Sequence, residues 1–146
     1  MNPGALLLSI RPEHADKILG GEKTVELRRR RPRLGPGSPV IVYVSSPVQS
    51  VVASLIVDCV IAAAPRRLWR ACAKACGLTR AEFNAYFSGA KVGFGIVIRQ
   101  VARWRNPVSL EQIRDLCPTF CPPQGYYYLE PHRSTDAALR RRLLAA

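Results

Sequence analysis

The chain has 146 residues, with 22 lysines and arginines against 10 aspartates and glutamates, and its formal net charge is +12. This length fits one compact domain over residues 1–146, and no apolar run is long enough to form a transmembrane helix. The charge balance argues against a disordered acidic tail and against a small enzyme for neutral substrates. It favours a partner with many phosphates, because each neutralised phosphate releases condensed counterions. We therefore expect a single soluble domain that binds a polyanion and does not contact a membrane.

The five cysteines predict neither disulfides nor a metal site. Their number is odd, and the first residues lack the basic region and cleavage site of a secretory signal, so we expect a cytoplasmic protein with reduced thiols. Cys72 and Cys76 are four residues apart, and Cys117 and Cys121 repeat that spacing. Four thiolates could hold zinc, but the usual spacing has two intervening residues. Because Cys72 and Cys76 share an apolar helix face with Leu68, we expect them in the core, and we expect no cofactor.

The first half of the chain predicts short strands around one helix. The period-2 and helical patterns predict a strand (5–10), a helix from Pro12 to Gly20, a strand (23–28), a basic loop (29–39) and two apolar strands (40–44 and 51–61). In the strand over residues 23–28, alternation directs Val25 and Leu27 toward the core and places Glu26 and Arg28 together on the opposite face.

The second half of the chain predicts helices separated by two further strands. The predicted elements are a helix from Pro65 to Gly77, a helix opened by the capping box of Thr79 and Glu82, a strand (92–98) that runs on toward Trp104, a short helix opened by Ser109 and Gln112, a strand (125–129) and a basic helix (about 134–145). Irregular spacing of the strands argues against repeated βαβ units. We expect an α+β fold: a small, mostly antiparallel barrel of five or six strands with helices packed around it.

A resemblance to a known family begins at residues 21–28, Gly-Glu-Lys-Thr-Val-Glu-Leu-Arg. This segment resembles the G-x-K-x-x-E-x-R signature of ASCH domains, a branch of the PUA-like barrels. Residues 8–12, 42–47 and 122–126 are similar to flanking elements of that family, and the run from 68 to 91 resembles a prokaryotic subgroup of predicted regulators. The resemblance covers about residues 5–130 and implies a PUA-like β-barrel.

The signature residues predict a polar cleft. Lys23 lies at the turn that enters the strand, so an amine, the Glu26 carboxylate and the Arg28 guanidinium could converge. Arg28 and Lys23 could hold a phosphate or a base carbonyl, and Glu26 could accept from an exocyclic amine. The alternative is a partly exposed Glu–Arg pair that pins a turn and contributes under about 1 kcal/mol.

Binding of RNA or a modified nucleotide is the function that these features favour, and DNA stays open. Basic side chains would follow the phosphate backbone, and tyrosines would stack on bases, although Tyr126 and Tyr128 could equally face the core. The residues expected at this interface are Ser9, Arg11, Lys23, Glu26, Arg28, Arg29, Arg30, Arg31, Tyr43, Ser45, Gln124 and Tyr126.

The alternative function is hydrolysis of nucleic-acid components, with Lys23, Glu26 and Arg28 as catalytic residues. The resemblance implies that some ASCH proteins are amidohydrolases of acetylated cytidine that use a lysine, a threonine and a glutamate. Lys23 matches the lysine, but Glu26 occupies the threonine position and Cys76 lies near that of the glutamate. A ribonuclease would need a base and a cation. We expect His14 on the surface of its helix, and nothing in the sequence places His132 in the cleft.

Overall fold

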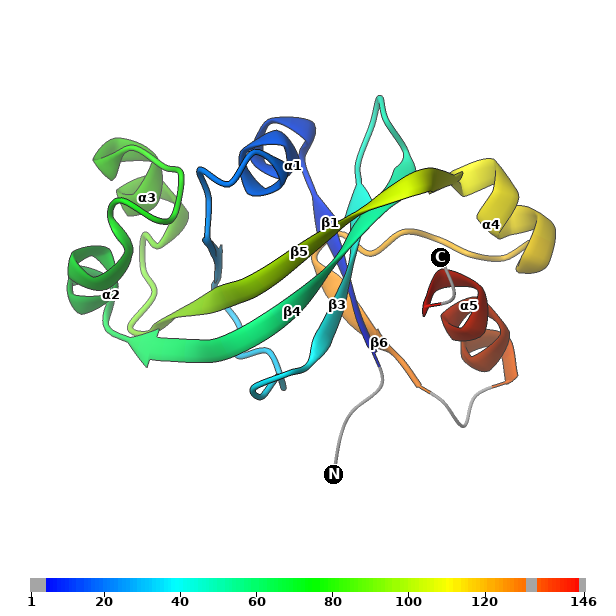
Figure 1. The fold of residues 1–146 in the computed structure, drawn as a ribbon. Coiled ribbons are helices and arrows are strands. Elements are labelled where there is room, and N and C mark those ends of the chain that lie inside the picture. The colour runs from blue at the N-terminus through cyan, green and yellow to red at the C-terminus, as the bar shows by residue number, and fades with distance from the viewer. Residues whose placement is uncertain (1–4, 131–133, 145–146) are drawn as a thin grey trace.

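A computed structural model describes residues 5–130 and 134–144, and one six-stranded sheet runs through them (Figure 1). The strand order is β2-β5-β4-β3-β1-β6. The strands are β1 (Ala5–Ile10), β2 (Val25–Arg28), β3 (Pro39–Val44), β4 (Ser50–Ala63), β5 (Gly93–Ser109) and β6 (Tyr126–Leu129). The helices are α1 (Pro12–Leu19), α2 (Pro65–Cys72), α3 (Arg80–Tyr86), α4 (Leu110–Leu116) and α5 (Ser134–Leu144).

The α+β fold and the mostly antiparallel sheet are confirmed. β1 runs parallel to β3, and the other neighbouring strands are antiparallel. The sheet curls into a half-barrel whose edge strands, β2 and β6, do not pair with each other within the described residues. The predicted barrel is therefore open on one side, and the helices lie around it. No helix in this part of the chain is long and apolar enough to cross a membrane.

Two predicted boundaries are wrong. The strand expected to pass Ile98 toward Trp104 continues to Ser109, because β4 pairs with β5 along most of its length and register shifts let the two long strands bend together. The helix expected to reach Gly77 ends at Cys72. The expected capping boxes are present at the starts of α3 and α4, where serine and threonine side chains accept from the third helical residue.

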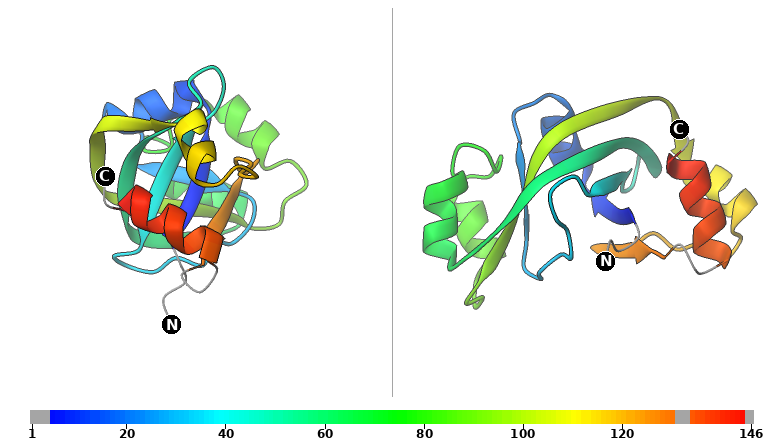
Figure 2. Two further views of the ribbon diagram at one scale, coloured as in Figure 1. Left: turned by 90° about the vertical axis from the view of Figure 1, so that its right-hand side faces the viewer. Right: turned by 60° about the horizontal axis from the view of Figure 1, so that its bottom comes forward.

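The core explains how the helices are held on the sheet. Alternate residues of β1 enter two different clusters: Leu7 packs with Leu139 and Leu143 of α5, and Leu8 packs on the opposite side with Ile18 of α1. A third cluster joins β2 to α2 and α3, which lie at one end of the sheet while α4 and α5 lie at the other (Figure 2). We call residues 65–87 the α2–α3 lobe.

Candidate functional site

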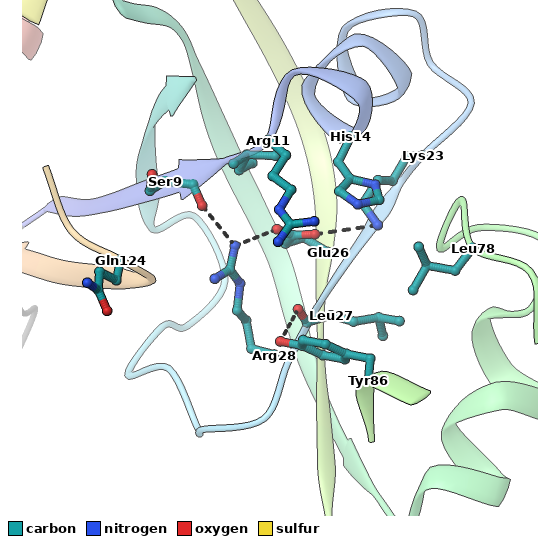
Figure 3. A pocket seen from close by; sticks show the side chains of 11 residues that line it. Ser9, Arg11, His14, Lys23, Glu26, Leu27, Arg28, Leu78, Tyr86 and Gln124 are labelled. Atoms are coloured by element: carbon teal, nitrogen blue, oxygen red, sulfur yellow. Dashed lines mark hydrogen bonds and ion pairs between the residues drawn. The ribbon is translucent and has the colours of Figure 1, made fainter. Parts of the chain in front are cut away.

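A pocket of about 330 Å³ lies between the end of β1, the start of α1, the edge strand β2 and the α2–α3 lobe (Figure 3). Its walls come from segments far apart in the sequence. One end of β2 lies beside α1, and the apolar face of β2 packs against the α2–α3 lobe. Six of the residues expected at a nucleic-acid interface line this pocket: Ser9, Arg11, Lys23, Glu26, Arg28 and Gln124.

Glu26 lies between the two cations of the signature. Its Oε2 accepts a hydrogen bond from Arg28 Nη2 at 2.7 Å, and its Oε1 lies 3.4 Å from Lys23 Nζ. Both carboxylate oxygens are therefore engaged, and the side chain is only 8% exposed. Glu26 therefore forms an ion pair with each of the two cations. Glu26 thus positions two cations, rather than offering a free carboxylate to a ligand.

Lys23 is almost completely buried, with 2% of its surface exposed. Its Nζ donates to the carbonyl of Cys76 in the loop that follows α2. The same loop accepts from the backbone, since the N–H groups of Thr24 and Val25 both donate to Ala75 O, at 2.9 and 3.1 Å. A carboxylate and a carbonyl are acceptors for an ammonium group. This environment holds the amine as a donor and does not favour its use as a nucleophile.

Arg28 connects the site to the far side of the open sheet. Its Nη2 donates to the backbone oxygen of Ser9 on β1 at 3.3 Å, in addition to its bond with Glu26. Its Nε is buried and has no hydrogen-bond partner within the described residues. A buried guanidinium N–H without a partner is costly, so a ligand oxygen that reached this donor would relieve that cost.

His14 was missed as a site residue, and the expectation that it lies on the helix surface is wrong. It is half-buried and lines the pocket, and its Nδ1 is a second buried atom without a hydrogen-bond partner in the described chain. One feature of the sequence does bear on the position of His14: Pro12 marks the first turn of α1 and so determines the helix face on which His14 lies. The sequence alone does not show that this face meets β2.

Tyr86 is a second lining residue that the sequence analysis did not select. It comes from α3, and its hydroxyl donates to the carbonyl of Leu27 at 3.2 Å. Burial raises the pKa of this hydroxyl above its ordinary value, yet 37% of the residue is exposed. An aromatic ring that is held at its tip and partly exposed can stack on a base.

A second pocket of about 410 Å³ adjoins the first and shares Ser9, Arg11 and Gln124 with it. Tyr43 and Ser45, both predicted interface residues, line this second pocket and not the first. Tyr43 is only 2% exposed, and burial raises the pKa of its hydroxyl. Its ring belongs to the core and is little exposed to the second pocket, and its stacking on a base stays a prediction.

The arginine-rich loop is partly tied to the protein itself. Arg29 Nη1 donates to the carbonyls of Tyr86 and Ser88 at 2.7 and 3.1 Å. The Arg31 guanidinium lies 5.1 Å from the centre of the Phe94 ring. Arg30 is exposed and takes part in no ion pair among the described residues. None of the three loop arginines that we expected at the interface lines either pocket.

Tyr126 also lies outside both pockets. It is half-buried on β6 and packs against the Tyr128 ring, with the two centres 6.1 Å apart. Arg33 covers Tyr128 at 4.5 Å, and its backbone N–H donates to the Tyr128 hydroxyl. These aromatic side chains hold the basic loop against the edge of the sheet. His132 lies outside the described residues.

All five cysteines are free, and Cys72 and Cys76 are buried as expected. Cys117 is half-buried and Cys121 is exposed. The described residues contain no group of three or more histidine, cysteine, aspartate or glutamate side chains that could hold a metal ion. The Cys72 thiol lies in the α2–α3 lobe, where burial, reinforced by the neighbouring Cys76 thiol, raises its pKa to about 11.

Comparison with known proteins identifies the family. The family model described as ASCH domain matches residues 8–110, which include the end of β1, all of β2 to β5 and the signature residues Lys23, Glu26 and Arg28. The chain belongs to the ASCH domain family. The predicted resemblance is thereby confirmed.

Two relatives and a solved structure extend this result. An ASCH domain-containing ribonuclease of Zymomonas mobilis is 28% identical over 123 residues, which are 84% of this chain and 82% of that protein. A crystal structure of ASCH from Zymomonas mobilis, 26% identical, superposes with a TM-score of 0.83 over 95% of this chain and 94% of its own. Large ribosomal subunit protein uL22 of Ureaplasma parvum is 26% identical over 86% of this chain, but the match covers only 39% of that protein.

Proposed function

We propose that this ASCH domain binds RNA and holds a nucleotide phosphate in the pocket beside Arg28. The observation that carries the proposal is that Arg28 and His14 line the same pocket, and that each has a buried nitrogen, Arg28 Nε and His14 Nδ1, without a hydrogen-bond partner among the described residues. Phosphate oxygens could accept from Arg28 Nε and from a protonated or suitably oriented imidazole. Lys23 and Arg28 share the single negative charge of Glu26, so the site keeps a positive charge that suits an anion.

Two further residues would extend this site to a nucleotide. The exposed Arg11 lines both pockets and forms no ion pair within the described chain. It could therefore hold a phosphate between them. The exposed part of the Tyr86 ring could stack on the adjoining base, an interaction of about 1–3 kcal/mol. Gln124, which also lines both pockets, could contact a base edge or the backbone.

RNA is favoured over other polyanions by the relative from Zymomonas mobilis, which is named a ribonuclease and matches over most of its length. The net charge of +12 supports a polyanionic ligand independently. The exposed arginine of the basic loop, Arg30, could contact a phosphate outside the pocket, whereas Arg29 and Arg31 already have partners in the fold.

Cleavage of the bound RNA is the second candidate function, and the position of His14 favours it. An imidazole in the pocket could accept the proton of a ribose 2′-hydroxyl as that oxygen attacks the neighbouring phosphorus. The bond from phosphorus to the 5′-oxygen of the next nucleotide would break, that oxygen would take up a proton from water, and a 2′,3′-cyclic phosphate would remain. Arg28 and the Lys23 ammonium would stabilise the charge that develops on the phosphate oxygens. Glu26 is less suited to act as the base, because both of its oxygens already contact cations.

A binding titration tests the proposal. Fluorescently labelled single-stranded RNA would be titrated with the wild-type protein, with Arg28→Lys and with the control variant Arg99→Lys, which changes an exposed arginine on β5 outside both pockets. Lysine cannot reproduce the planar fork of donors, so we expect Arg28→Lys to weaken binding about tenfold, which corresponds to about 1.4 kcal/mol. Equal affinity of all three proteins would contradict the proposal.

Two additions separate the alternatives. Unlabelled DNA of the same sequence, added as a competitor, shows whether the ribose 2′-hydroxyl contributes, because only RNA carries that group. The titrated samples, run on a denaturing gel, show whether the RNA stays intact. Cleavage that is lost in His14→Gln while binding is retained would establish the nuclease function. Intact RNA in every sample would exclude cleavage and leave RNA binding as the function.

A further inference from the structure

The outer face of helix α2 carries a second concentration of positive charge, away from the pocket residues. Arg66, Arg67 and Arg70 lie on the helix, and Lys74 follows one turn after Arg70. At about 100° per residue the three arginines fall within an arc of about 100°, and Lys74 lies just beyond the end of α2. We call these four residues the α2 basic face. The buried residues Leu68 and Cys72 lie on the opposite side of α2.

Nothing in the described chain neutralises this face. All four side chains are exposed, and none forms an ion pair within residues 5–130 and 134–144. The sequence contains no acidic residue between Asp58 and Glu82. Glu82 is itself committed to the start of α3, where its carboxylate accepts from the backbone N–H of Thr79 at 2.9 Å.

Packing fixes the α2 basic face in one orientation. Trp69 of α2 contacts the Phe83 ring of α3, with the centres 5.0 Å apart, and the Arg80 guanidinium lies over the Trp69 ring, 5.1 Å from its centre. Leu68 is completely buried against β5, where Gly93 leaves room for it. The charged side chains therefore project from a rigid helix and not from a flexible loop, which lowers the entropy cost of binding.

The same lobe forms part of the pocket. Leu78 and Tyr86 line the pocket from the lobe, and the carbonyl of Cys76 holds Lys23. Figure 1 shows α2 and α3 side by side at this end of the sheet. A nucleic acid strand that enters the pocket beside Tyr86 would therefore have a path along the lobe.

We infer that the α2 basic face binds the phosphate backbone of the same RNA whose nucleotide occupies the pocket. The inference rests on the proposed function and adds a second contact surface to it. The pocket would select a nucleotide, and α2 would contribute contacts that do not depend on base identity, because guanidinium and ammonium groups recognise phosphates. Affinity should then increase with RNA length beyond the number of nucleotides that the pocket can hold.

The test compares two variants that each lose two positive charges. Arg66→Gln/Arg70→Gln removes charge from α2, and glutamine keeps the helix propensity. Arg141→Gln/Arg142→Gln removes two exposed arginines from α5 and serves as the control. Binding of single-stranded RNA of about 4 and about 20 nucleotides is measured for both variants and the wild type between about 50 and 200 mM salt.

The α2 variant should bind the longer RNA more weakly, and its plot of log affinity against log salt should be less steep by about 1.4. This value corresponds to two lost single-strand phosphate contacts at about 0.7 each. The control should match the wild type, and the short RNA should bind all three proteins equally. A longer RNA whose affinity and salt dependence are unchanged by Arg66→Gln/Arg70→Gln would overturn the inference.

The outcomes also separate this inference from the proposed function. If the longer RNA binds in a manner that depends on Arg28 but not on α2, the inference fails and the pocket proposal stands. If binding depends on α2 and not on Arg28, the pocket proposal fails and the α2 basic face stands as an RNA-binding surface. If neither RNA binds the wild-type protein, both are overturned.

Discussion

The Arg28 guanidinium reaches from the edge strand β2 to the backbone carbonyl of Ser9 on β1, with Nη2 and the oxygen 3.3 Å apart. No strand pairing joins β2 to β1 or β6 among the described residues, so this hydrogen bond spans the open side of the half-barrel. The same nitrogen lies 2.7 Å from Glu26 Oε2. The signature side chains therefore stabilise the fold as well as shaping the pocket, and their variants need a stability measurement beside any binding assay.

Glu26→Gln should lower the free energy of unfolding by about 3 kcal/mol, because removal of one partner of a buried ion pair leaves the other charge uncompensated. Here the uncompensated group is Lys23, which is 2% exposed. Urea denaturation followed by circular dichroism measures the change. Glu22→Gln, at an exposed position in the turn before Lys23, is the matched control. A loss no larger than that of the control would show that the buried pair contributes little.

Acetylated cytidine should not be hydrolysed by the purified protein. The Lys23 Nζ donates to the Cys76 carbonyl and lies beside the Glu26 carboxylate, and these contacts hold the amine as a hydrogen-bond donor and not as a nucleophile. Release of acetate, followed by chromatography, checks this expectation. Turnover in the wild type that disappears in Lys23→Ala would show instead that Lys23 acts as the nucleophile of an amidohydrolase.

Gly93→Ala should destabilise the protein by about 1–3 kcal/mol, because the added methyl group overpacks the α2–α3 lobe. A Cβ at this position would lie 2.6 Å from the Phe87 ring and 2.8 Å from Leu68 Cδ2. The control is Gly35→Ala, where a Cβ would meet nothing within 4 Å. Thermal unfolding of the two variants compares them directly, and equal melting temperatures would argue against tight packing between the lobe and β5.

Stability should fall as the pH rises above about 9 toward 11, in part because of Cys72. Burial raises the pKa of this thiol from an ordinary 9.0 to about 11. The unfolded chain therefore loses the thiol proton at a lower pH than the folded chain, so deprotonation favours unfolding between about pH 9 and 11. Below pH 9 the thiol is protonated in both states, and its contribution to stability is fully present. Unfolding measured from pH 8 to 11 should show a smaller decline in Cys72→Ala. Parallel declines in the two proteins would contradict the assignment.

The sequence predicted those parts of the fold that local patterns determine. Alternation in β2 correctly separated Val25 and Leu27, which enter the core, from Glu26 and Arg28, which face the pocket. The serine and threonine caps of α3 and α4 are likewise local, and they were correctly predicted. The end of α2 was not, because the chain after Cys72 turns to place the carbonyls of Ala75 and Cys76 against β2 and Lys23.

The parts of the candidate site that were missed depend on contacts between distant segments. His14 joins the pocket only because α1 packs beside β2, and Tyr86 joins it only because α3 folds back to the carbonyl of Leu27. Arg29 and Arg31 form part of a basic run in the sequence, but the structure gives them a carbonyl pair and an aromatic ring as partners. Composition shows the charge of such a run, and tertiary packing decides which of its members remain free.

A crystal structure of the protein with a short single-stranded RNA tests the central claim most directly. We predict a phosphate oxygen within hydrogen-bonding distance of Arg28 Nε and His14 Nδ1, with a base against Tyr86. RNA bound elsewhere on the protein, with both of these nitrogens still lacking a ligand partner, would contradict it.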